Sequence, residues 1–382
     1  QGVSSAASDV YKRQGILTVP FNNNYGGYLQ AFALMSVLKQ MGHEPTLIMR
    51  RQNKRRMFIK AGIKYFIMGI YHSFKNKKMC PLIYKTERDF EYLGSNMHQF
   101  VDKRMLPQSP YLYTSEDLKR YCDGKFGAYI VGSDQVWRAI YVPDIANYFL
   151  DFTLGWNVKR IAYAASFGSQ NPEYTQEEKV VCCKMIPKFD AISLREKSGK
   201  HVFTNFGWEY NNLEIVLDPT LLLNSSDYTK LLPNVEEGIN GGMFYYILDK
   251  NQCISNVISD IQEKIKKPAY GISNIQCDYK PLPSIEDWLT YIKNASFVVT
   301  DSFHGMVFAI IFHKPFLVLV NGNRGADRFL NMLSLLGLQN RVLSGDLTLN
   351  EILEKEIDWD SVNTKLSILR EKSFKFLEHS LS

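Results

Sequence analysis

The stretch FVVTDSFHGMVFAIIFHKPFLVLV (Phe297–Val320) combines a strand, a polar turn, a helix and a second strand. Its β-branched and aromatic start predicts a strand buried on both faces, and its apolar centre predicts a covered helix. Ligands of parallel α/β sheets bind beyond the carboxyl ends of the strands, where helix N-termini favour anions. We therefore interpret His304, in the turn, as a group that holds an anion and donates a proton. The alternative is that Asp301 or Ser302 only caps the helix and His304 packs.

The composition is ordinary for a globular protein and leaves room for two domains. The 382 residues carry a formal net charge of +6, and chains of this length usually divide. Six cysteines show no CxxC pair and no framework spacing, which indicates reduced thiols in a cytoplasm and no structural metal. No apolar stretch reaches the roughly eighteen residues of a membrane span. Residues 1–14 lack the apolar core of a signal peptide, so we interpret them as a non-native leader rather than a disordered natural one.

The first half of the chain alternates strands and helices. Its opening βαβ unit consists of a strand, a glycine turn, a helix and a strand, over 16–20, 22–27, 28–41 and 44–49. This order predicts a parallel sheet. The glycine turn either cradles a phosphate or only gives the helix a tight entry. Later strands are predicted at 128–131, 160–167, 191–194 and 213–217, so we expect a Rossmann-like N-terminal domain over 15–222.

The second half repeats the alternation after a loop rich in Asn, Ser and Pro. Strands are predicted at 243–248 and 269–272. Helices are predicted at 254–266, at 285–295 with Ser284 as the N-cap, and at 329–336. We expect a linker over 223–240, a second Rossmann-like domain over 241–345 and a helical tail over 346–382. The apolar face of the tail predicts that its helix packs back across both domains.

The segment 50–90 is predicted to be a basic helical insertion. Between residues 50 and 85, lysine and arginine are nearly unopposed by acid and are interleaved with apolar residues at helical spacing. Such a helix either packs on its own domain or lies on anionic lipid, which would hold a cytoplasmic protein at the inner face of the membrane. The segment contains no recognised nucleic-acid-binding motif, so we expect no nucleic acid partner.

Polar side chains follow the predicted strand at 128–131. Asp134 and Gln135 would face a cleft at its carboxyl end, where Asp134 binds an acceptor hydroxyl or acts as a base. Trp137 offers a flat face for a sugar. The simpler alternative is a turn in which Asp134 caps a helix.

Three arginines also follow strand ends. Arg195 directly follows the predicted strand 191–194. Arg324 and Arg328 lie in the glycine-rich loop between Val320 and the predicted helix 329–336. An arginine in such a position can form two hydrogen bonds to a carboxylate or phosphate. Alternatively, Arg195 pairs with Glu196 or another surface carboxylate, and Arg328 pairs with Asp327.

Six short motifs, taken in order, resemble those of the bacterial polysaccharide pyruvyl transferases. They are Asn24-Tyr25-Gly26 with Leu29-Gln30, Val131–Trp137, Ala164–Gly168, Ser193–Gly199, Leu217–Leu222 and Thr300–Gly305. Each motif is short, but their order is specific, and the resemblance runs from Gly15 to about Arg341. The family is similar in fold to the GT-B glycosyltransferases. The resemblance therefore implies two Rossmann-like domains facing each other across a cleft, with the acceptor on the N-terminal side and the donor on the C-terminal side.

The resemblance implies transfer of the enolpyruvyl group of phosphoenolpyruvate to a sugar of an exopolysaccharide or capsule precursor. The products are a cyclic pyruvate ketal and inorganic phosphate, the acceptor is lipid-linked or soluble, and no cofactor or metal is needed. His304 matches the family's catalytic histidine, and the base is Asp134, with Asp301 as the second candidate. The implied donor-binding residues are Arg195, Ser302, Phe303, His304, Gly305, Arg324 and Arg328. The implied acceptor-binding residues are Asn24, Tyr25, Gly26, Ser133, Asp134, Gln135 and Trp137.

One position departs from the family pattern. Better-studied members have an arginine two places before the histidine, whereas this chain has Ser302, which carries no charge. We hypothesise that Arg324 or Arg328 supplies the missing cation. Two other functions fit the same fold, a glycosyltransferase that uses a nucleotide sugar and a non-catalytic carbohydrate-binding protein. The first usually requires an acidic pair for the ribose, and Asp327 stands alone near Arg324.

Overall fold

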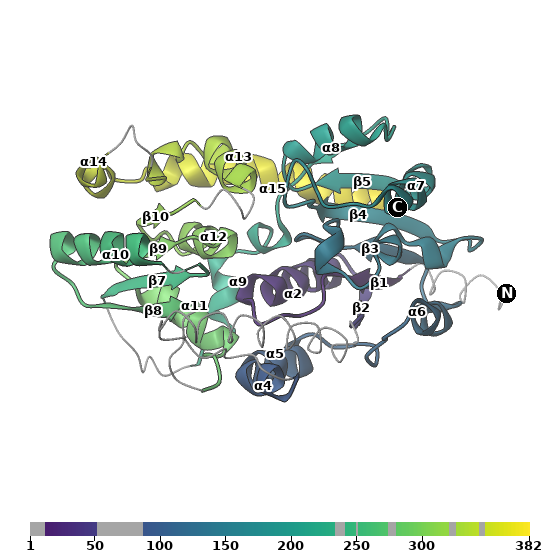
Figure 1. The fold of residues 1–382 in the computed structure, drawn as a ribbon, viewed down its shortest axis with the longest axis horizontal. Coiled ribbons are helices and arrows are strands. Elements are labelled where there is room, and N and C mark those ends of the chain that lie inside the picture. The colour runs from purple at the N-terminus through teal and green to yellow at the C-terminus, as the bar shows by residue number, and fades with distance from the viewer. Residues whose placement is uncertain are drawn as a thin grey trace, which may run out of the picture.

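The strands of this protein form two separate parallel sheets that lie side by side (Figure 1). The computed structural model describes residues 12–51, 87–233, 241–249, 251–273, 280–320, 326–343 and 348–382. Within these ranges, each sheet is built from strands that alternate along the chain with helices. Two Rossmann-like α/β domains are therefore confirmed.

The N-terminal sheet has six parallel strands in the order β2-β1-β3-β4-β5-β6. They are β1 (Arg13–Leu17), β2 (Glu44–Ile48), β3 (Ala128–Val131), β4 (Lys159–Ala165), β5 (Ala191–Leu194) and β6 (Glu214–Ile215). The bounds of β3 and β5 agree with the prediction, because each is a short apolar run that is almost wholly buried.

The C-terminal sheet has four parallel strands in the order β10-β9-β7-β8. They are β7 (Met243–Ile247), β8 (Ala269–Ser273), β9 (Phe297–Thr300) and β10 (Phe316–Val318). All residues of the internal strand β9 and of the edge strand β10 are buried, as expected for parallel strands covered on both faces.

Helices connect and cover these strands. They are α2 (Tyr25–Gln40), α4 (Glu87–Leu93), α5 (Ser95–Arg104), α6 (Ser115–Cys122), α7 (Gln176–Met185), α8 (Ser198–Phe206), α9 (Ser225–Thr229), α10 (Gln252–Ile265), α11 (Ile285–Asn294), α12 (Phe303–Ile311), α13 (Ala326–Leu336), α14 (Leu349–Glu354) and α15 (Trp359–Leu381). The predicted cap of α11 is confirmed, since Ser284 and Asp287 form a reciprocal capping box.

Two elements begin earlier than the sequence predicts. β1 begins at Arg13, and Gln14 pairs with Ala128 of β3, so the last two residues of the presumed leader belong to the sheet. α2 begins at Tyr25 rather than at residue 28, because the side chain of Asn24 accepts a hydrogen bond from the backbone N–H of Gly26. The glycines at 26 and 27 therefore lie in the first turn of a helix, and the predicted glycine turn ends before them.

α2 and α15 join the two domains. Tyr25 of α2 stacks on Trp288 of α11, with 5.1 Å between the ring centroids, and its hydroxyl donates a hydrogen bond to the carbonyl of Pro283 at 2.9 Å. α15 contacts both α13 and β4 and runs along both domains in Figure 1. Its Ser373 Oγ accepts a hydrogen bond from the N–H of Leu217 at 3.0 Å. The predicted packing of the C-terminal helix across the domains is confirmed.

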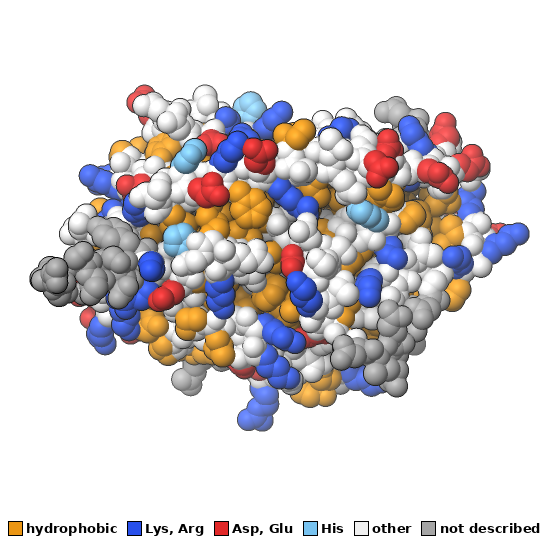
Figure 2. Space-filling model, turned by 180° about the vertical axis from the view of Figure 1, so that it is seen from behind, with side chains coloured by type: hydrophobic (Ala, Val, Ile, Leu, Met, Phe, Trp, Pro, Cys, Tyr) orange, Lys and Arg blue, Asp and Glu red, His pale blue; other side chains and the backbone are white. Residues whose placement is uncertain are grey.

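Most of the basic insertion, residues 52–86, lies outside the described residues, so its contact with lipid stays a prediction. No helix in the described ranges combines the length and the apolar character that crossing a membrane requires. On the face drawn in Figure 2, lysine and arginine side chains are interspersed with acidic and hydrophobic ones.

Candidate functional site

A pocket lies between the two domains at the carboxyl ends of four strands. Its empty volume, which includes open solvent at the mouth, is about 750 Å³. The segments after β1 and β3 form one wall, and the segments after β7 and β9, together with Arg328 of α13, form the other. Of the predicted site residues, those that line it are Asn24, Asp134, Gln135, Ser302, Phe303, His304 and Arg328.

The strand order explains the position of the pocket. From β1 the chain moves to β2 on one side, then crosses back to β3 on the other side of β1. The C-terminal sheet does the same, because the chain moves from β7 to β8 on one side and then crosses back to β9 on the other side of β7. Loops that leave a sheet in opposite directions open a crevice at the carboxyl ends of the strands. The pocket combines the two crevices, one from each domain.

His304 enters the pocket from the first turn of α12. Ser302 is the N-cap of this helix, and its Oγ accepts a hydrogen bond from the Gly305 N–H at 3.4 Å. His304 is almost buried but still lines the pocket. Both interpretations of the turn therefore hold in part, because serine caps the helix and the histidine faces the site.

Asp301 stabilises a loop and does not face the pocket. Its two carboxylate oxygens accept hydrogen bonds from the backbone N–H groups of Leu248, at 2.6 Å, and Asp249, at 2.9 Å. These bonds fix the segment that follows β7. Asp301 is therefore a poor candidate for the base, which corrects its place as the second choice.

The ring of His304 packs against Gly26 of α2. A Cβ atom at residue 26 would lie 1.9 Å from Nδ1 of His304, a distance that non-bonded atoms do not reach. Only glycine allows the histidine of one domain to approach the helix of the other this closely. The resemblance implies an acceptor contact for Gly26, whereas the structure gives it the task of positioning His304.

We expect Gly26→Ala to lower the melting temperature and to displace His304. The added methyl group overlaps the imidazole, and overpacking of this kind typically costs about 1–3 kcal/mol. Gly27→Ala is the matched control for stability, because a Cβ there meets no atom within 4 Å and alanine favours a helix by roughly 0.5–1 kcal/mol over glycine. Thermal unfolding of the two variants tests the contact, and equal melting temperatures would contradict it.

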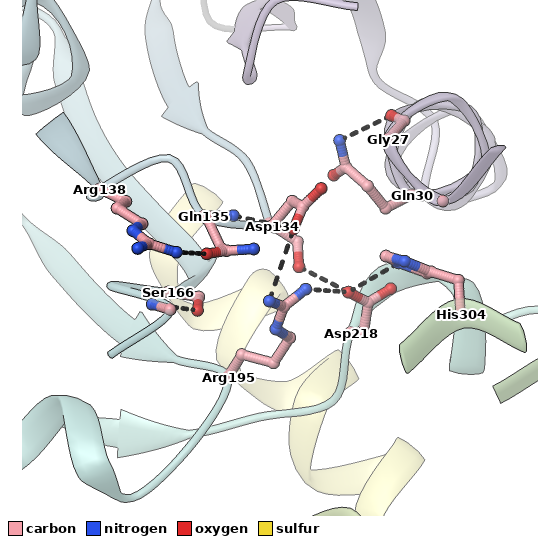
Figure 3. Close-up of polar contacts among 12 residues, drawn as sticks. Gly27, Gln30, Asp134, Gln135, Arg138, Ser166, Arg195, Asp218 and His304 are labelled. Atoms are coloured by element: carbon pink, nitrogen blue, oxygen red, sulfur yellow. Dashed lines mark hydrogen bonds and ion pairs between the residues drawn. The ribbon is translucent and has the colours of Figure 1, made fainter. Parts of the chain in front are cut away.

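Asp218 is the centre of a buried polar network beside His304 (Figure 3). Its Oδ2 accepts hydrogen bonds from Ser133 Oγ at 2.8 Å and from Arg195 Nη1 at 3.1 Å. Its Oδ1 accepts from the N–H and the hydroxyl of Thr220, at 3.1 and 2.7 Å. Nε2 of His304 lies 3.6 Å from Oδ2, which is within the range of an ion pair but longer than a hydrogen bond.

The pKa of Asp218 lies far below its usual range. Burial alone would raise it, but the positive charge of His304, the guanidinium of Arg195 and the hydroxyl of Thr220 lower it by more. The carboxylate therefore stays ionised and gives His304 a fixed negative partner. In the sequence Asp218 stands out only as the residue that ends a strand within a family motif. No local pattern shows that it faces a histidine of the other domain.

Arg195 is enclosed by carboxylates and does not line the pocket. Its guanidinium lies 3.1 Å from Asp218, 3.4 Å from Glu196 and 3.5 Å from Asp134, and the residue is only 2% exposed. Burial alone would lower its pKa, but these carboxylates together raise it above the usual value. The structure favours carboxylate pairing over the predicted donor contact, although the pairing is buried rather than at the surface. Arg195 holds the acidic groups of the site in place.

Asp134 lines the pocket from the end of β3. Its backbone φ of 71° lies in the left-handed region, which is uncommon for residues other than glycine. Its Oδ1 accepts a hydrogen bond from the N–H of Gln135 at 2.9 Å. The helix-cap alternative is wrong, because the next helical turn begins at Ala139 with Arg138 as its N-cap. Asp134 remains the candidate base as a prediction.

Among the described residues that line the pocket, Arg328 is the one arginine or lysine. Its Nε has no hydrogen-bond partner among the described residues, and its guanidinium carbon lies 5.7 Å from the ring centroid of Phe303. Burial and the nearby charge of Arg195 lower the pKa of Arg328 to about 10, so it stays charged at neutral pH. A buried cation in this state is stabilised by an incoming anion.

The predicted pairing of Arg328 with Asp327 is not found among the described residues. Asp327 accepts a hydrogen bond from Gln170 of the N-terminal domain at 2.8 Å, and within the described ranges it forms no ion pair with Arg328. Arg324 lies outside the described residues. Arg328 is therefore the better supported of the two replacements for the arginine that is missing at Ser302.

Trp137 belongs to the core of the N-terminal domain. It is fully buried, its ring stacks on Phe149 with 4.7 Å between centroids, and its Nε1–H donates a hydrogen bond to the carbonyl of Tyr148 at 2.9 Å. It therefore has no face to offer a sugar, and the predicted acceptor contact is wrong. An aromatic residue after a strand suits a core as well as a binding site, and its neighbours decide between the two.

Tyr25 and Ser133 are also buried and do not line the pocket. The first packs between the domains, and the second bonds to Asp218. The structure thus corrects their predicted acceptor contacts. It adds Tyr141, which lines the pocket, is 41% exposed, and accepts a hydrogen bond from Arg138 at 3.2 Å. No motif in the sequence marks Tyr141.

Comparison with known proteins identifies a family and a fold. A family model described as polysaccharide pyruvyl transferase matches residues 24–323. Among solved structures, the UDP-GlcNAc 2-epimerase of Methanocaldococcus jannaschii in complex with UDP-GlcNAc and UDP is 13% identical with a TM-score of 0.51, covering 94% of this chain and 99% of that chain. The S. aureus MnaA–UDP structure is 11% identical with a TM-score of 0.50, covering 93% and 90%. These likenesses show the GT-B-like fold alone. No individual curated protein matches this chain.

Proposed function

This chain belongs to the polysaccharide pyruvyl transferase family, and from that premise we propose that it transfers the enolpyruvyl group of phosphoenolpyruvate to a saccharide. The acceptor would be a soluble or lipid-linked precursor of an exopolysaccharide or capsule. The main support is the placement of His304 between Gly26 and Asp218, in a pocket that Arg328 also lines. Such a site combines a proton donor with a cation for the donor's carboxylate or phosphate.

The carboxylate beside His304 supports this residue as the acid. Nε2 of His304 lies 3.6 Å from Oδ2 of Asp218, and hydrogen bonds from Ser133, Arg195 and Thr220 fix the Asp218 carboxylate. A histidine that lies beside a fixed carboxylate and lines a pocket is well placed to transfer a proton to a substrate.

The proposed reaction begins with proton transfer from His304 to the methylene carbon of phosphoenolpyruvate. The adjacent carbon becomes oxocarbenium-like, and a hydroxyl oxygen of the sugar bonds to it while Asp134 takes the hydroxyl proton. The bond from this carbon to the phosphate oxygen then breaks, and phosphate leaves with the electron pair. A second hydroxyl of the same sugar closes the ketal. The proton that Asp134 took passes to the leaving phosphate, and the proton of the second hydroxyl restores His304.

Incubation of the full chain with phosphoenolpyruvate and a panel of soluble and lipid-linked saccharides tests this function. We expect mass spectrometry to detect a pyruvate ketal on the acceptor, and phosphate release to require both substrates. Transfer from a nucleotide sugar instead, or saccharide binding without any transfer across the panel, would support one of the two rival functions and refute the proposal.

We expect Arg328→Gln to raise the KM for phosphoenolpyruvate by about 10–100-fold, because a hydrogen bond to a charged group contributes roughly 1.5–3 kcal/mol. Arg328→Lys should restore part of the loss, since it keeps the charge but not the planar guanidinium. Arg120→Gln is the control, because the Arg120 side chain is 73% exposed on α6 and pairs with Glu116. Steady-state kinetics measures all three, and an unchanged KM in Arg328→Gln would remove Arg328 from the donor site.

A further inference from the structure

Glu173 holds Arg138 in a fixed position beside the pocket. Nε and Nη2 of Arg138 donate hydrogen bonds to the two carboxylate oxygens of Glu173, at 3.1 and 2.6 Å. Hydrogen bonding from Arg138 lowers the pKa of Glu173, so both groups are charged at neutral pH. Arg138 itself is 9% exposed and does not line the pocket. A two-point contact of this kind fixes the plane of the guanidinium and the direction of its remaining N–H groups.

The remaining Nη1 group of Arg138 orients two side chains that do line the pocket. It donates hydrogen bonds to Oε1 of Gln135 and to the hydroxyl oxygen of Tyr141, each at 3.2 Å. Because a guanidinium can only donate, the oxygen of the Gln135 amide faces Arg138 and its nitrogen points away from it (Figure 3). Gly168 makes room for this orientation, since a Cβ atom at residue 168 would lie 1.9 Å from Oε1 of Gln135.

Both side chains therefore keep N–H or O–H groups for the pocket. Gln135 has two N–H groups on Nε2, and Tyr141 has its O–H. Among the described residues, none of these groups donates a hydrogen bond. Arg328 lines the same pocket and adds guanidinium N–H groups. Gln135 and Tyr141 on the N-terminal side and Arg328 on the C-terminal side thus present hydrogen-bond donors to one space.

This arrangement favours an anion over a neutral sugar. Phosphate and carboxylate groups offer many acceptors, whereas a sugar hydroxyl also needs an acceptor for its own proton. The carboxylate of Asp134, which lines the pocket, has Arg195 as a counter-charge at 3.5 Å. We propose that Gln135 and Tyr141 donate hydrogen bonds to the phosphate or carboxylate of the pyruvyl donor, and that Arg138 is the positioning residue that orients both. The proposal rests on the proposed function, and it gives Gln135 a contact with the donor instead of the acceptor.

Calorimetric titration of the full chain with phosphoenolpyruvate, in the absence of an acceptor, tests this contact without requiring turnover. We expect Tyr141→Phe to raise the Kd by about 10–100-fold, the size of one hydrogen bond to a charged group. This variant keeps the ring, whose centroid lies 4.7 Å from the guanidinium carbon of Arg138. Tyr113→Phe is the matched control, because Tyr113 is also exposed but does not line the pocket, and it should bind like the wild type.

Two further variants separate the N–H groups of Gln135 from the position of its side chain. Gln135→Glu can still accept the hydrogen bond from Arg138, but it replaces two N–H groups with a negative charge, so binding of phosphoenolpyruvate should be abolished. Arg138→Met should weaken binding by about 10-fold or more, and Arg138→Lys should restore part of the loss because an ammonium group still donates. Titration with inorganic phosphate and with pyruvate shows which end of the donor responds to Tyr141→Phe.

Three results would overturn this assignment. They are a wild-type Kd in folded Tyr141→Phe, retained binding of phosphoenolpyruvate by Gln135→Glu, and no binding of phosphoenolpyruvate by the wild type. Circular dichroism shows whether each variant is folded. Ketal formation together with a Kd that no variant changes would refute this inference and leave the proposed function intact. Binding that depends on Tyr141 and Gln135, without ketal formation on any acceptor, would refute the proposed function alone.

Discussion

Replacement of His304 by alanine is expected to lower kcat for pyruvyl transfer by about 100–10,000-fold, the contribution of a well-placed general acid. The methylene carbon of the donor would then have no placed proton source, while Arg328 would still bind the anion. The KM for phosphoenolpyruvate should therefore change little. His304→Gln, which keeps the size and polarity of the side chain but cannot carry the proton, should lose as much activity as His304→Ala.

Phosphate release and ketal formation, measured together, provide the test. His201→Ala is the control, because His201 is an exposed histidine of α8. Circular dichroism and thermal unfolding show whether the His304 variants remain folded. A folded His304→Ala protein with wild-type kcat would exclude this histidine as the acid, but it would not change the family to which the chain belongs.

Asp218→Asn is expected to cause the largest loss of stability. The carboxylate is fully buried and receives hydrogen bonds from Ser133, Arg195 and Thr220. Removing one partner of a buried ion pair typically costs about 3–5 kcal/mol, because the other charge stays buried without compensation. Here that charge belongs to Arg195. His304 would also lose its negative partner, so activity should fall in the fraction that remains folded.

The pH dependence distinguishes the charge of Asp218 from its shape. Since the folded-state pKa of Asp218 is far below its usual value, its contribution is fully present above the unfolded pKa of about 3.9 and is lost as the pH falls towards the folded value. The stability difference between wild type and Asp218→Asn should therefore shrink below roughly pH 4.

Denaturant unfolding at a series of pH values measures this difference. Asp260→Asn is the control, because Asp260 is exposed on α10, and this substitution should leave stability nearly unchanged at every pH. A stability difference for Asp218→Asn that stays constant into acid would show that the amide disturbs packing and that the buried charge contributes little.

The predictions that succeeded depend on local sequence. The strand and helix around His304 follow from an apolar run, a polar turn and a second apolar run, and the cap of α11 follows from Ser284. Hydrogen bonds within a turn or a helix involve neighbours in the chain, so the sequence shows both partners. The predicted packing of α15 was also correct, because an amphipathic helix must cover an apolar surface.

The predictions that failed concern residues whose partners are distant in the chain. Trp137 and Arg195 have side chains that suit a substrate, but Phe149 stacks on the first and Asp218 binds the second. The sequence places Gly26 in a turn, whereas in the structure the ring of His304 packs against it. In each case the residue type permits two environments, and burial together with the charge of the neighbours selects one.

By itself, the sequence determined two parallel α/β domains, the helix start that presents His304, and the family to which the motifs belong. Only the tertiary structure decided what surrounds that histidine. It brings Asp218 of the N-terminal domain next to His304 and places Arg328 in the pocket that His304 lines. It also pairs Arg195 with buried carboxylates, away from the pocket. The physical reason is that electrostatic contacts depend on distance in space, whereas the sequence records only distance along the chain.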